Sequence, residues 1–526
     1  MNTEQLDQLH QAIQLFWGFK LGECEQILVK YNSQLPLFAL LYADIAFIKA
    51  VLTETKEDNE EASKRIAECK KLARALQLSQ KPLYLKQEKD EKKLSSSANN
   101  NGSDSQSAFT RAEYLIAKLV YAETMVMKGI IEFKAQNNIK AGMSFRKSWK
   151  QFYQAFEQVV QLPTTFPAYQ HLVSLAYYGV GIFHFLVSVV PPQYVWLVEG
   201  IGFKANRMEG LKEIKLSADV TTGIRSVMAK CCYTLLYAFF FEDFEAAAPT
   251  LKDLLERYPD GAMINYMSGA ILRKQGIIQQ SSASYNNALK NSGELKQLQL
   301  FLESELGYNE FLNLNWTVAE QHLSKFLKDT TSSGFKAFIQ YQLAYCYEMM
   351  DNREQALTVM SGVEQNVRKG YDFDEFSLRK ANRYLKNKKL NAFERAYAQS
   401  ALLNEAHNFE ASNKIILEAL TLPSLTPEEL AAGNYMVGAN YQQLDQRTEA
   451  KKYYSTSLTY EKQIGYDHFI VPYSNVGLAE IAILEDKKSD AKAHIKKAKS
   501  YNSTQYDFPS ILDWRARKCL QQLGEF

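Results

Sequence analysis

The amino-acid sequence predicts an all-α fold, and three observations lead to that prediction. Apolar residues recur at intervals of three and four positions through most of the chain, whereas sustained alternation with a period of two is hard to find. Helix breakers are scarce, with 12 Pro and 24 Gly among 526 residues. Pairs of small residues twelve positions apart recur along the sequence, which indicates that the helices are joined into repeated hairpins.

The small-residue pairs mark the contact between the two helices of each hairpin. The pairs are Ala50/Ala62, Gly129/Ala141, Gly269/Ser281, Gly307/Ala319, Ala344/Ala356, Ser400/Ser412, Gly438/Ala450 and Ala479/Ala491. Two antiparallel helices approach closely only where the crossing residues lack bulk, and turn signals such as "AQNN" and "LDQRTE" separate the members. The third position of each repeat, seven residues beyond the pair, holds Cys69, Ser148, Ala288, Phe326, Val363, Ala419, Ser457 and Ala498. This spacing predicts a tetratricopeptide-like helical-repeat array, an α-solenoid.

The predicted array divides into four stretches. Residues 1–88 are expected to form N-terminal helical repeats. Residues 89–108, "KDEKKLSSSANNNGSDSQSA", have almost no apolar side chain to bury and predict a flexible polar loop. Residues 109–260 are expected to be central helices that include an apolar segment, 158–203. Residues 261–526 are expected to be C-terminal tetratricopeptide repeats, continuous with the rest of the array.

The repeat is most regular near the C-terminus. The stretch "YMVGANYQQLDQRTEAKKYYSTSL" places Gly438 on a first helix and Ala450 on a second. The positions that we expect to hold the array together are Gly269, Ala319, Ala356, Gly438, Ala450, Ala479, Ala491, Pro191 and Pro192. The two prolines belong to this set because a proline pair ends the long apolar helix before it.

One segment of the central stretch carries no charge. No Asp, Glu, Lys or Arg occurs between Gln158 and Val198, in a chain with 23% charged residues. As a helix, Leu172 to Val190 would be about 28 Å long, enough to cross a bilayer. A crossing would divide one repeat array between opposite faces of a membrane, so we expect no transmembrane span and a helix buried at the centre of the array. An apolar groove for a lipid or an amphipathic partner helix stays open as an alternative.

The composition and motifs give no support to an enzyme. No phosphate loop, nucleophile elbow or zinc-binding motif occurs, and the six cysteines form no C-x-x-C pair, so no catalytic residue, metal site or cofactor is predicted. The odd histidine, His184 in the uncharged segment, is expected to be a hydrogen-bonded core residue rather than a ligand or base. A net charge of +2 is too small to give the protein an overall positive potential that would attract nucleic acid. The N-terminal residues lack a secretory pattern, so we expect cytoplasmic or nuclear residence.

A basic cluster is a candidate for a partner-binding site. The residues concerned are Arg379, Lys380, Arg383 and Lys386 in "RKANRYLKNKK". Arg379, Arg383 and Lys386 share one face of a helix and could clamp a carboxylate or phosphate of a partner. The alternative is a solvated helix whose charge is neutralised by the acids of "YDFDEF", just ahead of it.

Four blocks in this order resemble the tetratricopeptide repeat protein 39 family, which includes the fungal inclusion-body-clearance proteins. They are "LLYADIAFIKAVLT", "GVGIFHFLVSVVPPQYVWLVEGIGFKANRMEGLKEI", "LLERYPDGAMINYMSGAI" and "FSLRKANRYL". Where the family usually shows "GF-x-G-D-R", this chain has "GFKANR", without the acid before Arg207. The resemblance implies a non-enzymatic cytoplasmic protein that acts through partners. It also implies a role in lipid metabolism or in clearing protein inclusions with lipid droplets.

Two hypotheses for function follow. The leading one is a scaffold or adaptor for protein partners, because a curved stack of repeats offers a long concave surface. The second is a lipid- or membrane-associated module that uses the uncharged segment 158–198, with contact at lipid droplets or organelle membranes.

Overall fold

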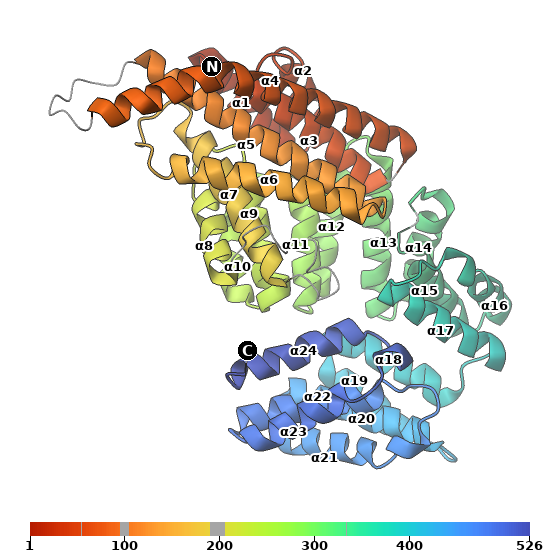
Figure 1. Cartoon of the computed structure of the whole chain (residues 1–526). Coiled ribbons are helices and arrows are strands. Elements are labelled where there is room, and N and C mark those ends of the chain that lie inside the picture. Colours follow the sequence, from red (N-terminus) through yellow and green to blue (C-terminus); the bar gives the residue numbers. More distant parts are fainter. Residues whose placement is uncertain (54, 95–104, 190–205, 333, 526) are drawn as a thin grey trace. The chain divides into compact units, whose positions relative to one another are not determined.

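The computed structural model of the chain describes residues 1–53, 55–94, 105–189, 206–332 and 334–525, and every regular element in these ranges is a helix (Figure 1). Successive helices pack against one another as hairpins along the sequence. The chain forms two compact units, one of residues 1–271 with 284–299, the other of residues 272–283 with 300–526. The predicted all-α helical-repeat fold is confirmed.

The first half of the chain contains twelve α-helices and one π-helical turn in the described residues. They are α1 (Thr3–Trp17), α2 (Leu21–Leu28), α3 (Pro36–Thr53), α4 (Lys56–Leu94), α5 (Ser105–Lys134), α6 (Asn138–Val159), α7 (Tyr169–Val189), α8 (Arg207–Ala218), α9 (Ser226–Leu235), η2 (Leu236–Phe241), α10 (Phe244–Arg257), α11 (Ala262–Lys274) and α12 (Ile278–Lys290). The polar stretch 89–108 includes the end of α4 and the start of α5, and residues 95–104 within it lie outside the described ranges.

The second half continues with shorter, more uniform helices. They are α13 (Lys296–Leu312), α14 (Trp316–Asp329), α15 (Lys336–Met349), α16 (Arg353–Ser361), η3 (Glu364–Asn366), α17 (Asp372–Asn387), α18 (Ala392–Glu405), α19 (Phe409–Ala419), α20 (Pro427–Gln443), α21 (Arg447–Leu458), η4 (Glu461–Gln463), α22 (Ile470–Leu484), α23 (Lys488–Lys499), η5 (Ser503–Gln505) and α24 (Pro509–Gln522).

Every small residue that defined the repeat is buried. Each of the eight pairs places its first member on one helix and its second on the next, and all third positions are buried as well. Glycine is required where an aromatic ring fills the crossing: a Cβ on Gly438 would lie 2.8 Å from the ring of Tyr454, and one on Gly129 would lie 2.7 Å from Phe145. The predicted steric role of these positions is therefore confirmed.

The turn inside each hairpin also repeats, at a position that sequence analysis did not single out. Seven residues after the first small residue, the backbone adopts the left-handed region in seven of the eight repeats. These residues are Gln136, Gly276, Leu314, Asp351, His407, Asp445 and Asp486. A left-handed residue ends a helix by satisfying its last carbonyls, and glycine adopts this conformation at the lowest cost. Here only one of the seven is glycine, so the other hairpins retain local strain.

The apolar helix α7 is buried along one side. Leu172, Leu175, Ala176, Val180 and Phe185 are at most 1% exposed. Pro36–Thr53 and Tyr169–Ser188 have the length and composition of a membrane span, but 61% and 56% of their windows are buried, as in core helices. The fold thus has the predicted buried apolar helix. Residues 190–203 of the predicted segment, including Pro191 and Pro192, lie outside the described ranges.

His184 on α7 forms a hydrogen bond, as predicted. Its Nδ1 lies 2.6 Å from the carboxylate of Glu213 on α8, and its ring packs edge-on against Trp149 of α6. The side chain is half-buried at the edge of the core. Below it α7 and α8 cross so closely that a Cβ on Gly181 would lie 2.8 Å from the carbonyl of Gly210.

A buried ion cluster joins three elements of the first unit. Arg225, which caps α9, donates to Asp44 of α3 at 2.6 and 3.1 Å and to Glu123 of α5 at 3.1 and 3.4 Å. All three side chains are buried. Burial works against the charge of Arg225, yet the two carboxylates raise its pKa above the usual value. Burial raises the pKa of Glu123, although the nearby charge of Arg225 acts to lower it.

Candidate functional site

The second unit contains a cavity of about 540 Å³ between its repeats. Helices α15, α17, α18 and α20 supply most of the lining, and residues of α13 and around the starts of α22 and α24 complete it. The thirteen aromatic residues of the lining are Tyr308, Phe311, Phe338, Tyr341, Tyr345, Phe376, Tyr384, Phe393, Tyr397, Tyr435, Phe469, Tyr473 and Phe508. Such a cavity, apolar with a few convergent polar groups, is a typical binding site. We call it the C-terminal groove.

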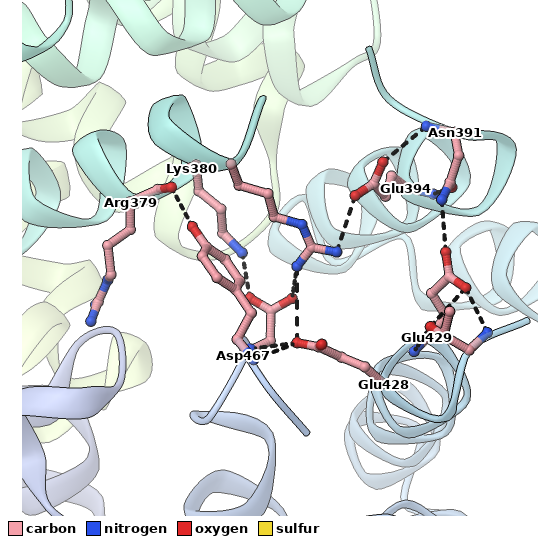
Figure 2. Close-up of polar contacts among 10 residues, drawn as sticks. Arg379, Lys380, Asn391, Glu394, Glu428, Glu429 and Asp467 are labelled. Atoms are coloured by element: carbon pink, nitrogen blue, oxygen red, sulfur yellow. Dashed lines mark hydrogen bonds and ion pairs between the residues drawn. The ribbon is translucent and has the colours of Figure 1, made fainter. Parts of the chain in front are cut away.

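A network of charged side chains lies along one wall of the groove (Figure 2). Arg383 of α17 pairs with Glu394 of α18 at 3.1 Å and with Asp467 at 3.1 Å. Lys380, one helical turn earlier, pairs with the same Asp467 at 2.8 Å. Glu428 of α20 accepts the backbone N–H of Asp467 at 2.6 Å. Burial would raise the pKa of Asp467, but the two cations hold it below its usual value.

Two of the carboxylates in the groove also cap helices. Glu394 and Asn391 form a capping box at the start of α18, and Glu429 forms another with Thr426 at the start of α20. Asn391 links the two boxes by donating to Glu429 at 2.8 Å, as Figure 2 shows. Burial would raise the pKa of Glu429, but the hydrogen bonds from Thr426 and Asn391 hold it below its usual value. The wall is therefore positioned by the same contacts that begin its helices.

The start of α24 and the two residues before it pack against α17. Arg379 forms an ion pair with Asp507, and Ser510 donates to Asp372. The ring of Phe508 packs against Phe373 and Phe376, with centroids 5.1 and 5.2 Å apart. Asp507 and Phe508 both line the groove. These contacts hold the segment from residue 507 to 511 against the side of the cavity.

Three of the four basic residues singled out in the sequence gather here. Arg379, Lys380 and Arg383 each pair with an acid of the chain itself, whereas Lys386 is exposed and has no ion pair among the described residues. The neutralising acids are not those just ahead of the cluster. Asp374, the buried member of that group, pairs with Arg368 at 2.8 Å.

Sequence reasoning missed Asp467 and Asp507, because they follow their basic partners by 84 to 128 residues. A signal for them exists in the two similar loops "GYDHF" and "QYDFP", which hold Asp467 and Asp507 just before helices. The positions Gly269, Ala319, Ala356, Gly438, Ala450, Ala479 and Ala491 are buried between helices, outside the groove. No cluster of three or more His, Cys, Asp or Glu suited to a metal occurs in the described part of the chain.

A comparison with models of known protein families identifies the family of this chain. The model described as Iml2/Tetratricopeptide repeat protein 39 matches residues 10–404. The chain belongs to this family. The resemblance inferred from the sequence is confirmed. The match ends before five of the six carboxylates of the groove, namely Glu405, Glu428, Glu429, Asp467 and Asp507.

This family member shares little sequence identity with a relative from Caenorhabditis elegans. It is 21% identical over 559 residues to "Tetratricopeptide repeat protein ttc-39B" of Caenorhabditis elegans, covering 99% of the chain and 93% of that relative. Among solved structures, the apo form of RapI matches with a TM-score of 0.40 and 12% identity, over 80% of this chain and 98% of RapI. A Rap protein complexed with competence and sporulation factor matches with a TM-score of 0.34 and 13% identity, over 77% and 98%. TM-scores this low carry no information on function.

Proposed function

We propose that this family member is a non-enzymatic scaffold that binds protein partners, and that the C-terminal groove receives a segment of the partner. The observation that supports this most is the groove itself, an apolar cavity of about 540 Å³ rimmed by charged groups. Tetratricopeptide-type arrays act through their concave surfaces, on which side chains from successive repeats converge. The membership of the chain in a tetratricopeptide family supports the same conclusion.

A substitution that fills the cavity tests the proposal. Ala398 on α18 lines the groove and is half-buried, so Ala398→Trp should occupy space that a partner needs. The matched control is Lys414→Trp on α19, which is exposed and outside the lining. Each full-length variant would be expressed in its native cell with a proximity-labelling tag, and labelled proteins would be quantified. We expect a defined set to be lost with Ala398→Trp and retained with Lys414→Trp. Identical sets for both variants would contradict the proposal.

We also propose cytoplasmic residence with contact at lipid droplets or organelle membranes, in processes such as lipid metabolism or inclusion clearance. The support is the family resemblance together with apolar side chains exposed at the end of α7 and at the start of α8. Leu186 is 52% exposed and Met208 is 65% exposed. Fractionation with carbonate extraction tests this: release from membranes by carbonate is expected for peripheral contact. A wholly soluble pool, or resistance to carbonate, would contradict it.

A further inference from the structure

The charges that line the C-terminal groove are balanced within the chain. Each carboxylate of the lining has a cation of the chain beside it or near enough to act on it: Arg383 for Glu394, Glu428, Glu429 and Asp467, Arg379 for Asp507, and Arg273 with Lys274 for Glu405. Of the cations in the lining, Lys380 and Arg383 are held by these acids, and Lys389 is exposed to solvent. A charged side chain of a ligand would therefore lose its water in the groove without meeting an unpaired ion of opposite sign. This balance of charge favours an uncharged ligand.

The aromatic rings of the groove offer apolar surface rather than sites for a ligand cation. Phe376 and Phe508 pack together with ring centres 5.2 Å apart. The ammonium of Lys380 lies 5.7 Å from the ring centre of Phe376, and the guanidinium of Arg273 lies 5.1 Å from that of Tyr308. Cations of the chain thus already use ring faces that could attract a positive charge. The surface that is left suits apolar side chains, because aromatic rings bury large apolar areas on contact.

Gln342 of α15 is a buried polar side chain of the lining that lacks a hydrogen-bond partner. It is 2% exposed, and its amide forms no hydrogen bond with any of the described residues. Neither amide atom is fully enclosed by protein, so the amide opens onto the cavity. Gln340 on the same helix is different, since it donates to the carbonyl of Val359 at 2.8 Å and accepts from Asn366 at 2.6 Å. A buried amide without a partner is unfavourable until a ligand supplies the hydrogen bond.

Two tyrosine hydroxyls of the lining are in the same condition. Tyr397 of α18 and Tyr435 of α20 line the cavity, and neither hydroxyl forms a hydrogen bond within the described part of the chain. The hydroxyl of Tyr473, another lining residue, donates to the carbonyl of Phe508 at 2.9 Å. Burial raises the pKa of Tyr397 and of Tyr435, so both hydroxyls stay neutral. The groove therefore has three neutral hydrogen-bonding groups without partners, one on each of three helices.

We infer that the C-terminal groove binds an extended, uncharged segment of a partner protein. Apolar side chains of the segment lie against the aromatic rings, and its backbone forms hydrogen bonds with Gln342, Tyr397 and Tyr435. An extended chain offers an N–H and a C=O at every residue, about every 3.3 Å, and can meet groups that come from three helices. An acyl chain would fill the same apolar space but would leave the three polar groups unpaired. This inference rests on the proposed function and specifies the chemistry of the partner.

Selection from a random peptide library on the full-length protein tests the inference. Peptides that are retained by the native chain and by Lys414→Trp, and lost on Ala398→Trp, define the groove-dependent set. We expect this set to be enriched in aliphatic and aromatic residues and depleted in Asp, Glu, Lys and Arg relative to the unselected library. Enrichment in charged residues of either sign, or no bias, would overturn the inference while leaving the proposed function intact. Absence of any groove-dependent peptide would contradict the proposed function itself, and a fluorescent fatty acid whose binding Ala398→Trp abolishes would then identify a lipid site.

Direct binding then tests the role of the buried amide. A fluorescent peptide from the selected set would be titrated with three proteins: native, Gln342→Leu and Gln321→Leu. Gln321 is an exposed residue of α14 outside the groove and serves as the matched control. Gln342→Leu replaces an unpaired amide with an apolar group of similar size, so the fold should be retained. We expect Gln342→Leu to weaken binding by about fivefold, as for the loss of one neutral hydrogen bond, and Gln321→Leu to have no effect. Equal affinities for all three proteins would overturn the assignment to Gln342.

Discussion

Replacing Arg225 should be among the most destabilising single changes in the first unit. Its guanidinium makes four hydrogen bonds, of 2.6 to 3.4 Å, to the carboxylates of Asp44 and Glu123. Arg225→Met keeps much of the side-chain volume. It leaves the carboxylates of Asp44 and Glu123, which are each 5% exposed, buried without a cation. Removing one partner of a buried ion pair costs about 3–5 kcal/mol, and here that cost falls on two helices, α3 and α5.

Two assays test this prediction. Equilibrium urea unfolding of the full chain gives the free energy of unfolding, and hydrogen exchange is measured for peptides from α3, α5 and α9. We expect the free energy of unfolding of the first unit to fall by about 3–5 kcal/mol, with faster exchange in these three helices and little change in the second unit. The triple variant Arg225→Met, Asp44→Leu, Glu123→Leu is the control, and should recover most of the loss because no charge stays buried. A cost below about 1 kcal/mol for Arg225→Met would refute this account of the cluster.

The remaining predictions concern the repeats and the groove. Gly438→Ala should destabilise the second unit by about 1–3 kcal/mol in urea unfolding, since its Cβ would lie 2.8 Å from the buried ring of Tyr454; no loss would contradict the crossing geometry. Gln136→Gly should stabilise the first unit by about 1 kcal/mol, because Gln136 is exposed with φ 59°; a lower melting temperature would count against strain in the turn. The pKa of Asp467 is lowered in the folded protein. Its ionised carboxylate therefore stabilises the folded state above about pH 4, and this stabilisation is lost as the pH falls through the lowered pKa. Asp467→Asn should therefore lower the free energy of unfolding at pH 7 and make it fall less steeply as the pH is lowered. The same dependence on acid pH in the native chain and the variant would contradict the pairing with Lys380 and Arg383.

The repeat could be predicted from sequence because its physics is local. Two helices joined by a short turn meet at a fixed spacing, and Gly438 and Ala450 show the required lack of bulk directly in the sequence. The left-handed turn residues were harder to predict. Leu314 and Gln136 carry no signature of a residue with positive φ, and the surrounding helices impose that conformation on them.

The charge pattern of the groove could be predicted only in part. The basic residues of α17 are evident as a cluster in the sequence, but which acids neutralise them depends on how the last repeats fold back onto this helix. The cluster around Arg225 was missed for the same reason. Asp44 stands alone in the apolar run "LLYADIAFI", and an isolated acid in such a run signals a buried partner, although not its identity.

The most direct test of the central claim is photo-cross-linking from inside the groove. A photoreactive phenylalanine analogue would replace Tyr397, which lines the cavity, or Lys414, which lies outside it, in the full-length chain in its native cell. Mass spectrometry would identify the cross-linked peptides. We predict that position 397 captures a short segment of another protein that position 414 does not capture. Cross-links from position 397 that match those from position 414, or that reach only this chain itself, would contradict the claim that the groove binds a partner.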